Sequence, residues 1–254
     1  MYVACSTLCF GRHPLPRALS IIAELEFNKV DVAIQARGPH LTPSDVIADP
    51  NRAAQLIRIG PGLVPGAFNV EIEAPDAKTF DQQFHAICKL ARFSAVATMT
   101  IPAARAGSDF KQEVERLKRL QRVATAEGII LTVETRIGTL TETPAAAIDL
   151  CDAVDDLGLT LDPSHYICGP HQGRSFDDVF PYVRHVHLRD TGRTPDKMQV
   201  LVGQGEIEYS RIISLLERYD YDRLLTVEII DVPDAPFYME SEVRKLKYLL
   251  ESLV

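Results

Sequence analysis

The chain has 254 residues, 46% of them hydrophobic and 24% charged, and a formal net charge of −8 at pH 7. The length suits one large domain, and the acidic balance argues against a general nucleic-acid binder, which usually carries a basic face. Because the sequence has five cysteines without CxxC spacing, no signal-like leader and no apolar run of about 18 residues, we expect a cytoplasmic protein with reduced thiols and no membrane span.

Strand-like and helix-like patterns alternate along the whole sequence. Short apolar runs predict eight strands, at residues 2–7, 29–34, 67–72, 94–101, 129–134, 159–162, 184–190 and 224–228. Apolar residues at helical spacing predict the intervening helices, at residues 14–25, 43–59, 76–92, 109–127, 144–154, 176–180, 209–217 and 239–253. Eight strand–helix repeats without a linker-like segment predict a parallel sheet closed into a single (β/α)8 TIM barrel over residues 1–254.

The seventh predicted strand has two chemically different faces. Alternation places Val186 and Leu188 on one side and a polar group on the other: His185, His187 and Arg189. Histidines and a guanidinium are unusual on a buried strand. The pattern is understandable if the polar face ends at a functional site.

Three other predicted strands end on a carboxylate, at Glu134, Asp162 and Glu228. In each case a threonine stands two residues earlier on the same face: Thr132, Thr160 and Thr226. In the seventh strand, His185 takes that place below His187. The sequence therefore predicts a polar layer beneath three carboxylates and one imidazole. Because TIM-barrel sites lie at the carboxyl ends of the strands, and these donors suit a hard or borderline cation, we expect one divalent Mn, Mg, Co or Zn ion there.

Six segments carry a family resemblance, in this order along the chain: 6–10 (STLCF), 132–134 (TVE), 161–165 (LDPSH), 185–190 (HVHLRD), 203–207 (GQGEI) and 226–229 (TVEI). With them the sequence resembles the xylose isomerase-like TIM-barrel superfamily, and within it the sugar phosphate isomerase/epimerase group of ketose 3-epimerases, hydroxypyruvate isomerases and inosose dehydratases. The resemblance implies a sugar or polyol substrate and four metal ligands, which are the same strand-end residues: Glu134, Asp162, His187 and Glu228.

The resemblance also implies residues that contact the substrate. His165, three residues past Asp162, matches a histidine that contacts substrate. Arg193, six residues past His187, matches a substrate-binding arginine of the ketose epimerases. A helix-start or loop role for His165 and a solvent-exposed role for Arg193 are the alternatives. Arg189 faces the site by strand alternation, so it either binds substrate or neutralises the carboxylates.

The first half of the predicted site departs from the family. Asp31 stands where relatives often have Glu, and it would either bind a substrate hydroxyl or pair with a buried cation. The third and fourth predicted strands lack the histidines that many relatives have there. His185 is expected to hydrogen bond beneath the ligands rather than to bind the ion. The segment Gly203-Gln204-Gly205 indicates loop geometry, because it lacks the third glycine and the preceding strand of a dinucleotide motif.

The predicted chemistry is proton transfer next to a carbonyl. A divalent ion polarises the carbonyl and stabilises the enediolate that forms when the α-proton leaves. Glu134 and Glu228, on different strands around the same ion, are the predicted acid/base pair because each could reach one face of a bound sugar. The sequence therefore favours a metal-dependent isomerase or epimerase of a ketose or keto-polyol.

Three other functions are alternatives. The nearest is a dehydratase of a keto-inositol or keto-sugar, in which the same enediolate expels a β-hydroxyl. A DNA-repair endonuclease of this superfamily would use a three-metal cluster with further ligands on the earlier strands, which are not evident, so nucleic acid is not an expected partner. The third is a barrel that binds a ligand without catalysis. Since relatives often form dimers or tetramers, a homodimer or homotetramer is expected, and the polar loop at residues 190–206 could act as a lid.

Overall fold

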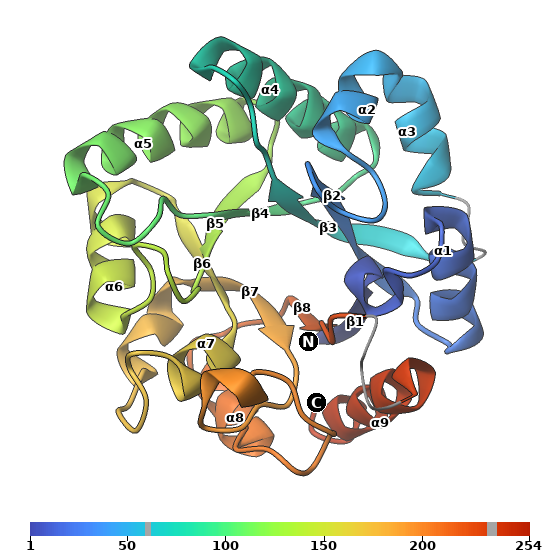
Figure 1. Ribbon diagram of the computed structural model, residues 1–254, viewed down its shortest axis with the longest axis vertical. Coiled ribbons are helices and arrows are strands. Elements are labelled where there is room, and N and C mark those ends of the chain that lie inside the picture. Colours follow the sequence, from blue (N-terminus) through green and yellow to red (C-terminus); the bar gives the residue numbers. More distant parts are fainter. Residues whose placement is uncertain (59–61, 233–237) are drawn as a thin grey trace.

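Eight parallel strands form a closed barrel in the computed structural model, and helices surround it (Figure 1). The structure describes residues 1–58, 62–232 and 238–254. Consecutive strands are neighbours in the sheet, and the last strand closes the barrel by pairing with the first. The strands are β1 (Tyr2–Ser6), β2 (Lys29–Gln35), β3 (Val64–Glu71), β4 (Thr98–Pro102), β5 (Ile130–Glu134), β6 (Gly158–Leu161), β7 (Val183–Leu188) and β8 (Leu224–Val227). The predicted TIM-barrel fold is confirmed.

Helices connect successive strands and cover the outside of the barrel. They are α1 (Leu15–Glu24), α2 (Pro43–Ala48), α3 (Pro50–Leu56), α4 (Ala77–Phe93), α5 (Phe110–Ala126), α6 (Pro144–Ala153), α7 (Pro163–Cys168), α8 (Tyr209–Arg218) and α9 (Met239–Glu251). Side-chain caps fix where several of them begin. Asp76 accepts a hydrogen bond from the N–H of Thr79 at 2.8 Å, and Asp109 accepts one from Gln112 at 2.9 Å.

The predicted helix at residues 43–59 is two helices in the structure. Asp49 leaves the helical path, with φ −150° and ψ 85°. It precedes Pro50, which disfavours the α conformation at Asp49 and has no N–H to continue the first helix. Asp49 then caps α3 by accepting from the N–H of Arg52 at 2.9 Å. The predicted end of this helix, at residue 59, lies outside the described residues.

Other elements also differ from the prediction, among them β3, which begins at Val64 rather than residue 67. β4 begins at Thr98 rather than residue 94, because Ser94 ends α4 and Ala95 takes a left-handed conformation with φ 57°. The sequence did not indicate α7, which follows β6 directly and is capped by Asp162. The predicted helix at residues 176–180 is a 3₁₀ turn at Asp177–Tyr182.

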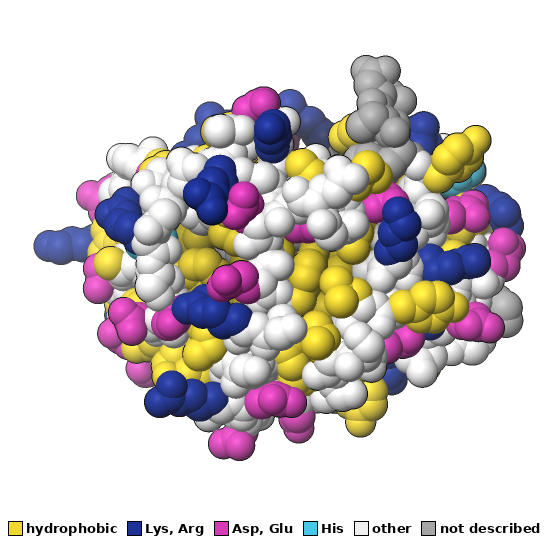
Figure 2. Space-filling view, turned by 90° about the horizontal axis from the view of Figure 1, so that it is seen from below, with side chains coloured by type: hydrophobic (Ala, Val, Ile, Leu, Met, Phe, Trp, Pro, Cys, Tyr) yellow, Lys and Arg dark blue, Asp and Glu magenta, His cyan; other side chains and the backbone are white. Residues whose placement is uncertain are grey.

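The outer surface carries charges of both signs. Acidic and basic side chains are interspersed over the face shown in Figure 2, with hydrophobic side chains between them. Such a mixed face differs from the continuous basic face of nucleic-acid binders. Among the described residues, no helix has the length and apolar character needed to cross a bilayer.

The cysteines are all buried free thiols: Cys5, Cys9, Cys88, Cys151 and Cys168. Burial raises the pKa of Cys88 and that of Cys151 to about 12. Because the thiolate is the reactive form, we expect iodoacetamide at mildly alkaline pH to leave all five cysteines unmodified in the folded protein and to alkylate all five in concentrated guanidinium. Mass spectrometry counts the adducts. Rapid alkylation of a thiol in the folded protein would contradict the expectation.

Candidate active site

A layer of buried hydroxyl and imidazole groups lies inside the barrel, below the strand ends. The Oγ1 of Thr160 is 2.7 Å from the Oγ1 of Thr132 and 2.7 Å from that of Thr100. The Oγ1 of Thr226 lies 3.3 Å from the Nε2 of His185. The polar layer that the sequence predicts is therefore present, with Thr100 of β4 as an additional member. Because these groups pair with one another, they avoid the cost of burying an unpaired polar group.

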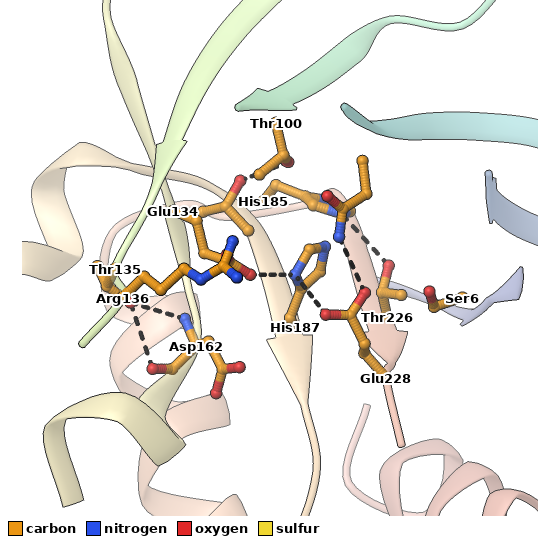
Figure 3. A network of polar contacts seen from close by, with 12 residues as sticks. Ser6, Thr100, Glu134, Thr135, Arg136, Asp162, His185, His187, Thr226 and Glu228 are labelled. Atoms are coloured by element: carbon orange, nitrogen blue, oxygen red, sulfur yellow. Dashed lines mark hydrogen bonds and ion pairs between the residues drawn. The ribbon is translucent and has the colours of Figure 1, made fainter. Parts of the chain in front are cut away.

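Above this layer, three of the four strand-end residues converge (Figure 3). Glu134 is the last residue of β5, His187 lies in β7, and Glu228 directly follows β8. The Nδ1 of His187 lies 3.1 Å from the Oε1 of Glu134 and 3.3 Å from the Oε1 of Glu228. All three side chains are buried, and one ligand atom from each lies within 4.8 Å of the others.

Asp31 of β2 orients His187 from below. Its Oδ2 lies 2.7 Å from the Nε2 of His185 and 3.1 Å from the Nε2 of His187. A carboxylate only accepts, so each ring donates its Nε2–H to Asp31. Burial alone would raise the pKa of Asp31, but the two rings lower it far below its usual value. Of the two roles considered for Asp31, the structure favours pairing with a buried cation, and it directs the Nδ1 of His187 toward Glu134 and Glu228.

His187 thus has a carboxylate at each ring nitrogen. Burial alone would lower the pKa of His187, but Glu228, Asp31 and Glu134 raise it well above its usual value. Burial would raise the pKa of Glu134, whereas the neighbouring His187 lowers it. In the metal-free protein the ring is therefore an imidazolium, with its Nδ1–H directed between Glu134 and Glu228.

The three donors fit a divalent cation. Ligand atoms at usual bond lengths from a shared ion lie ~2.8–3.6 Å apart at octahedral or tetrahedral angles. The two distances from the Nδ1 of His187, 3.1 and 3.3 Å, fall within this range. A cation at this point would take the place of the Nδ1 proton and would be neutralised by Glu134 and Glu228. These three residues could therefore hold the predicted ion.

Metal binding at this point is expected to release a proton. Because the pKa of His187 is raised, the imidazolium is present at neutral pH and must lose its proton when the ion binds. The affinity for Mn²⁺ should therefore increase with pH up to this raised pKa and become constant above it. Titration calorimetry in buffers of different ionisation enthalpy should detect about one proton released per ion. A binding heat that does not depend on the buffer would show that His187 is already neutral.

Asp162, the fourth predicted ligand, has other partners. Its Oδ2 pairs with the guanidinium of Arg189, and its Oδ1 accepts from the N–H of Ser164 at 2.9 Å and from its hydroxyl at 2.5 Å. The Oγ of Ser164 also accepts from the Nε of Arg189 at 3.0 Å. The structure therefore does not bring Asp162 into the cluster around His187. Arg189 neutralises Asp162, which is one of the two roles expected of this arginine.

His165 lies beside the pair of Asp162 and Arg189. Its Nδ1 lies 3.2 Å from the backbone N of Ile137, and its Nε2 lies 3.2 Å from the Nη2 of Arg189; both of these neighbours are donors. A neutral imidazole has one acceptor nitrogen, so only one of the two contacts is a hydrogen bond. Burial lowers the pKa of His165 and thus favours this neutral form. The Nε2 lies 3.7 Å from the Oδ2 of Asp162, too far for a strong hydrogen bond. His165 therefore lies beside Arg189 in the wall of the same cavity.

Arg193 lies at the surface. Its Nη2 is 2.9 Å from the Oε2 of Glu206, and 70% of its side chain is exposed. The structure thus places Arg193 in the alternative, solvent-exposed role, and does not bring it to the other predicted site residues.

The loop at residues 190–206 is attached to the barrel rim by Asp190 and Gln199. The Oδ2 of Asp190 accepts from the N–H groups of Gly203 at 2.7 Å and Gly205 at 3.0 Å. A Cβ at residue 205 would lie 2.1 Å from Asp190, and Gly203 has φ 87°, so loop geometry requires both glycines, as predicted. Gln199 hydrogen bonds to the backbone N–H and C=O that follow β8.

A cavity of about 600 Å³ opens above the cluster, which is an ordinary size for a small-molecule site. Its wall includes four of the predicted residues: Glu134, His165, Arg189 and Glu228. The cavity therefore brings both candidate acid/base residues and two candidate substrate contacts to one space.

Two residues of the cavity wall, Asn69 and Arg136, were not identified from the sequence. The Nδ2 of Asn69 donates to the Oε2 of Glu228 at 3.2 Å. An amide at the inner face of a predicted strand is a weak signal that could have indicated Asn69. Arg136 follows Glu134 by two residues, in a loop where an arginine is normally solvated, so the sequence gives no signal for it.

Comparison with known proteins is consistent with this architecture. The profile of the family described as xylose isomerase-like TIM barrel matches residues 40–249. Comparison with curated protein sequences returns no match.

Several solved structures share the fold. The probable 3-DHS dehydratase AsbF from Bacillus anthracis has a TM-score of 0.74 and 16% identity over 99% of both chains. A D-allulose 3-epimerase from Methylomonas sp. has a TM-score of 0.76 and 13% identity, over 100% of this chain and 98% of that chain. A xylose isomerase-like TIM barrel protein from Mycobacterium smegmatis in complex with magnesium has a TM-score of 0.75 and 18% identity, with the same coverage. At these identities the likeness shows the fold, and the reaction has to be argued from the site.

Proposed function

The chain belongs to the xylose isomerase-like TIM barrel family, and from this premise we propose that it is a divalent-metal-dependent isomerase or epimerase of a ketose or keto-polyol. One observation carries the proposal. Glu134 and Glu228 are buried carboxylates that approach the Nδ1 of His187 from different strands and line the same cavity (Figure 3). Proton transfer at a sugar carbonyl needs such a pair of acid/base groups beside a site for a cation.

The reaction uses these groups in turn. When bound, a divalent ion would polarise the substrate carbonyl and stabilise negative charge on its oxygen. One of the two carboxylates, Glu134 or Glu228, removes the proton from the carbon next to the carbonyl, which gives an enediolate. In an epimerisation the other carboxylate returns a proton to the opposite face. In an isomerisation the proton returns to the neighbouring carbon.

The surrounding side chains position the reacting groups. Asn69 donates to one oxygen of Glu228 and leaves the other directed toward His187. We propose that the imidazole of His165 and the guanidinium of Arg189 contact substrate oxygens, since both line the cavity. We also propose Asp162 as a fourth metal ligand, reached if its carboxylate turns away from Arg189.

A dehydratase is the second candidate, because a protein with the same fold is described as a probable 3-DHS dehydratase. Both reactions begin with the same proton abstraction. In a dehydratase, the enediolate would expel the hydroxyl β to the carbonyl, and the carboxyl group that took up the α-proton, on Glu134 or Glu228, would return it to this hydroxyl so that water leaves.

Metal content and hydrogen exchange test the proposed function. Protein purified without chelator is expected to hold about one divalent ion per chain, measured by mass spectrometry. The protein is then incubated with ketoses and keto-inositols in deuterated water. NMR should show loss of the substrate α-proton, and the product distinguishes reprotonation from loss of water. Failure to bind Mn, Co, Mg or Zn, together with no exchange for any sugar, would overturn the proposal; one tightly bound sugar without turnover would favour the binding barrel.

A further inference from the structure

Four arginines line the cavity, and three of them are held by close acidic partners. The three are Arg12 with Asp231 at 2.7 Å, Arg37 with Glu73 at 2.7 Å, and Arg189 with Asp162. The pair of Arg189 and Asp162 is buried, whereas 50% of the Arg12 side chain and 84% of the Arg37 side chain are exposed, so solvent weakens those two pairs.

Arg136 is the fourth arginine, and its guanidinium is only loosely engaged. Its Nη1 lies 3.4 Å from the Oε1 of Glu71 and 3.9 Å from the Oε2 of Glu134. Among the residues that the structure describes, the Nε and Nη2 of Arg136 have no hydrogen-bond partner. Figure 3 shows the side chain extended toward Glu134 and His187, so these free N–H groups lie close to the proposed reaction centre.

A cation in the cluster would engage one of the two carboxylates that lie near Arg136. A divalent ion adds two positive charges and engages Glu134, one of the two carboxylates near Arg136. The remaining one, Glu71, has 38% of its side chain exposed, so solvent weakens its interaction with Arg136. Arg136 would therefore keep one carboxylate neighbour, Glu71, at 3.4 Å.

We propose that the substrate is a keto-sugar acid whose carboxylate is bound by Arg136. A guanidinium offers two parallel N–H donors that match the two oxygens of a planar carboxylate. A phosphate has three oxygens and usually takes several donors, whereas each of the other three arginines of the cavity already contacts a carboxylate. The inference rests on the proposed function, because it assigns the charge of the substrate on which Glu134 and Glu228 act.

Binding of matched sugars tests this assignment. D-Tagatose and D-tagaturonate differ only in a terminal hydroxymethyl or carboxylate group, as do D-fructose and D-fructuronate. Titration calorimetry with Mn²⁺-loaded protein should show ~10–100-fold tighter binding of at least one acid than of its neutral sugar, which is the usual contribution of a charge-assisted bidentate pair. D-Tagatose 6-phosphate should bind less tightly than D-tagaturonate.

Substitutions at two arginines identify the residue responsible. Arg136→Gln should abolish the preference for the acid, and Arg136→Lys should retain only part of it, since Lys is not bidentate. Arg193→Gln removes the same charge from a surface arginine and should leave the preference unchanged. If thermal unfolding shows that Arg136→Gln is not folded, the affinities for the acid and for its neutral sugar are compared in Arg136→Lys instead. The preference for the acid should then be smaller than in the wild type.

Several results would overturn the assignment. They are equal affinity for acid and neutral sugar, a preference that survives substitution of Arg136, tighter binding of the phosphate, and binding by none of the compounds. Because affinity is measured without turnover, the proposed function can fail separately. A preference for the acid that depends on Arg136, without any α-proton exchange, would support the anion site and count against the isomerase.

Discussion

Replacing His187 by alanine is expected to remove the divalent ion from the protein. The Nδ1 of His187 is the donor shared by Glu134 and Glu228, at 3.1 and 3.3 Å. Loss of a residue that merely supports a ligand weakens metal binding by ~10–100-fold, so loss of this ligand should weaken it at least ~100-fold. Metal analysis by mass spectrometry, on wild type and variant purified in parallel without chelator, should show the ion in the first and almost none in the second.

A matched control shows whether the loss of metal is specific to His187 or follows the removal of any histidine. His85 is an exposed histidine of α4, outside the candidate active site, and His85→Ala should keep the full metal content. Thermal unfolding of the metal-free proteins checks that His187→Ala is folded. Full metal content in a folded His187→Ala protein would remove the cluster from consideration as the metal site.

Glu134→Gln and Glu228→Gln are each expected to reduce exchange of the substrate α-proton by ~10³-fold or more. A general acid or base contributes ~10²–10⁴-fold, and glutamine keeps the size of the side chain but removes its basicity. Exchange of the α-proton with deuterated water is followed by NMR, with the metal content of each variant measured in parallel. A variant that retains its ion but has lost exchange would identify an acid/base role beyond metal binding.

Glu71→Gln provides the control for these two variants. Glu71 lines the same cavity, but 38% of its side chain is exposed and it does not belong to the cluster around His187. We expect it to retain exchange, because removal of a cavity carboxylate by itself does not affect the reacting groups. Wild-type exchange in Glu134→Gln or in Glu228→Gln would refute the paired acid/base mechanism.

Local sequence patterns were sufficient to predict the barrel and the core of the site. Alternation of strand and helix periods, repeated along the chain, identified a parallel barrel, and its strands all end at one edge. Residues at those ends, Glu134, His187 and Glu228, were therefore expected to meet, and they do. The interrupted helix at Asp49-Pro50 also has a local cause, although the amphipathic pattern across it concealed the break.

Partners from distant parts of the chain could not be predicted in this way. Asp31 hydrogen bonds to His185, 154 positions away, and Asn69 to Glu228, 159 positions away. Strand alternation shows that such a side chain faces the interior, but not which group it meets there. For the same reason, the sequence left two roles open for Arg189, and it did not show that this arginine would pair with Asp162, one of the predicted ligands.

The buried hydroxyls beneath the ligands also restrict how the strands align during folding. Thr100 lies opposite Thr132 in the pairing of β4 with β5, and both hydroxyls reach Thr160 of β6. A slip of one residue in any of these strands would turn its hydroxyl outward among the apolar helices. In an entirely apolar interior such a slip would cost little free energy. Here each slip would bury a hydroxyl without a hydrogen-bond partner, which destabilises the misaligned barrel. The same threonines that support the site thus help to select the native arrangement from misaligned barrels, which matters most for parallel sheets because they assemble slowly.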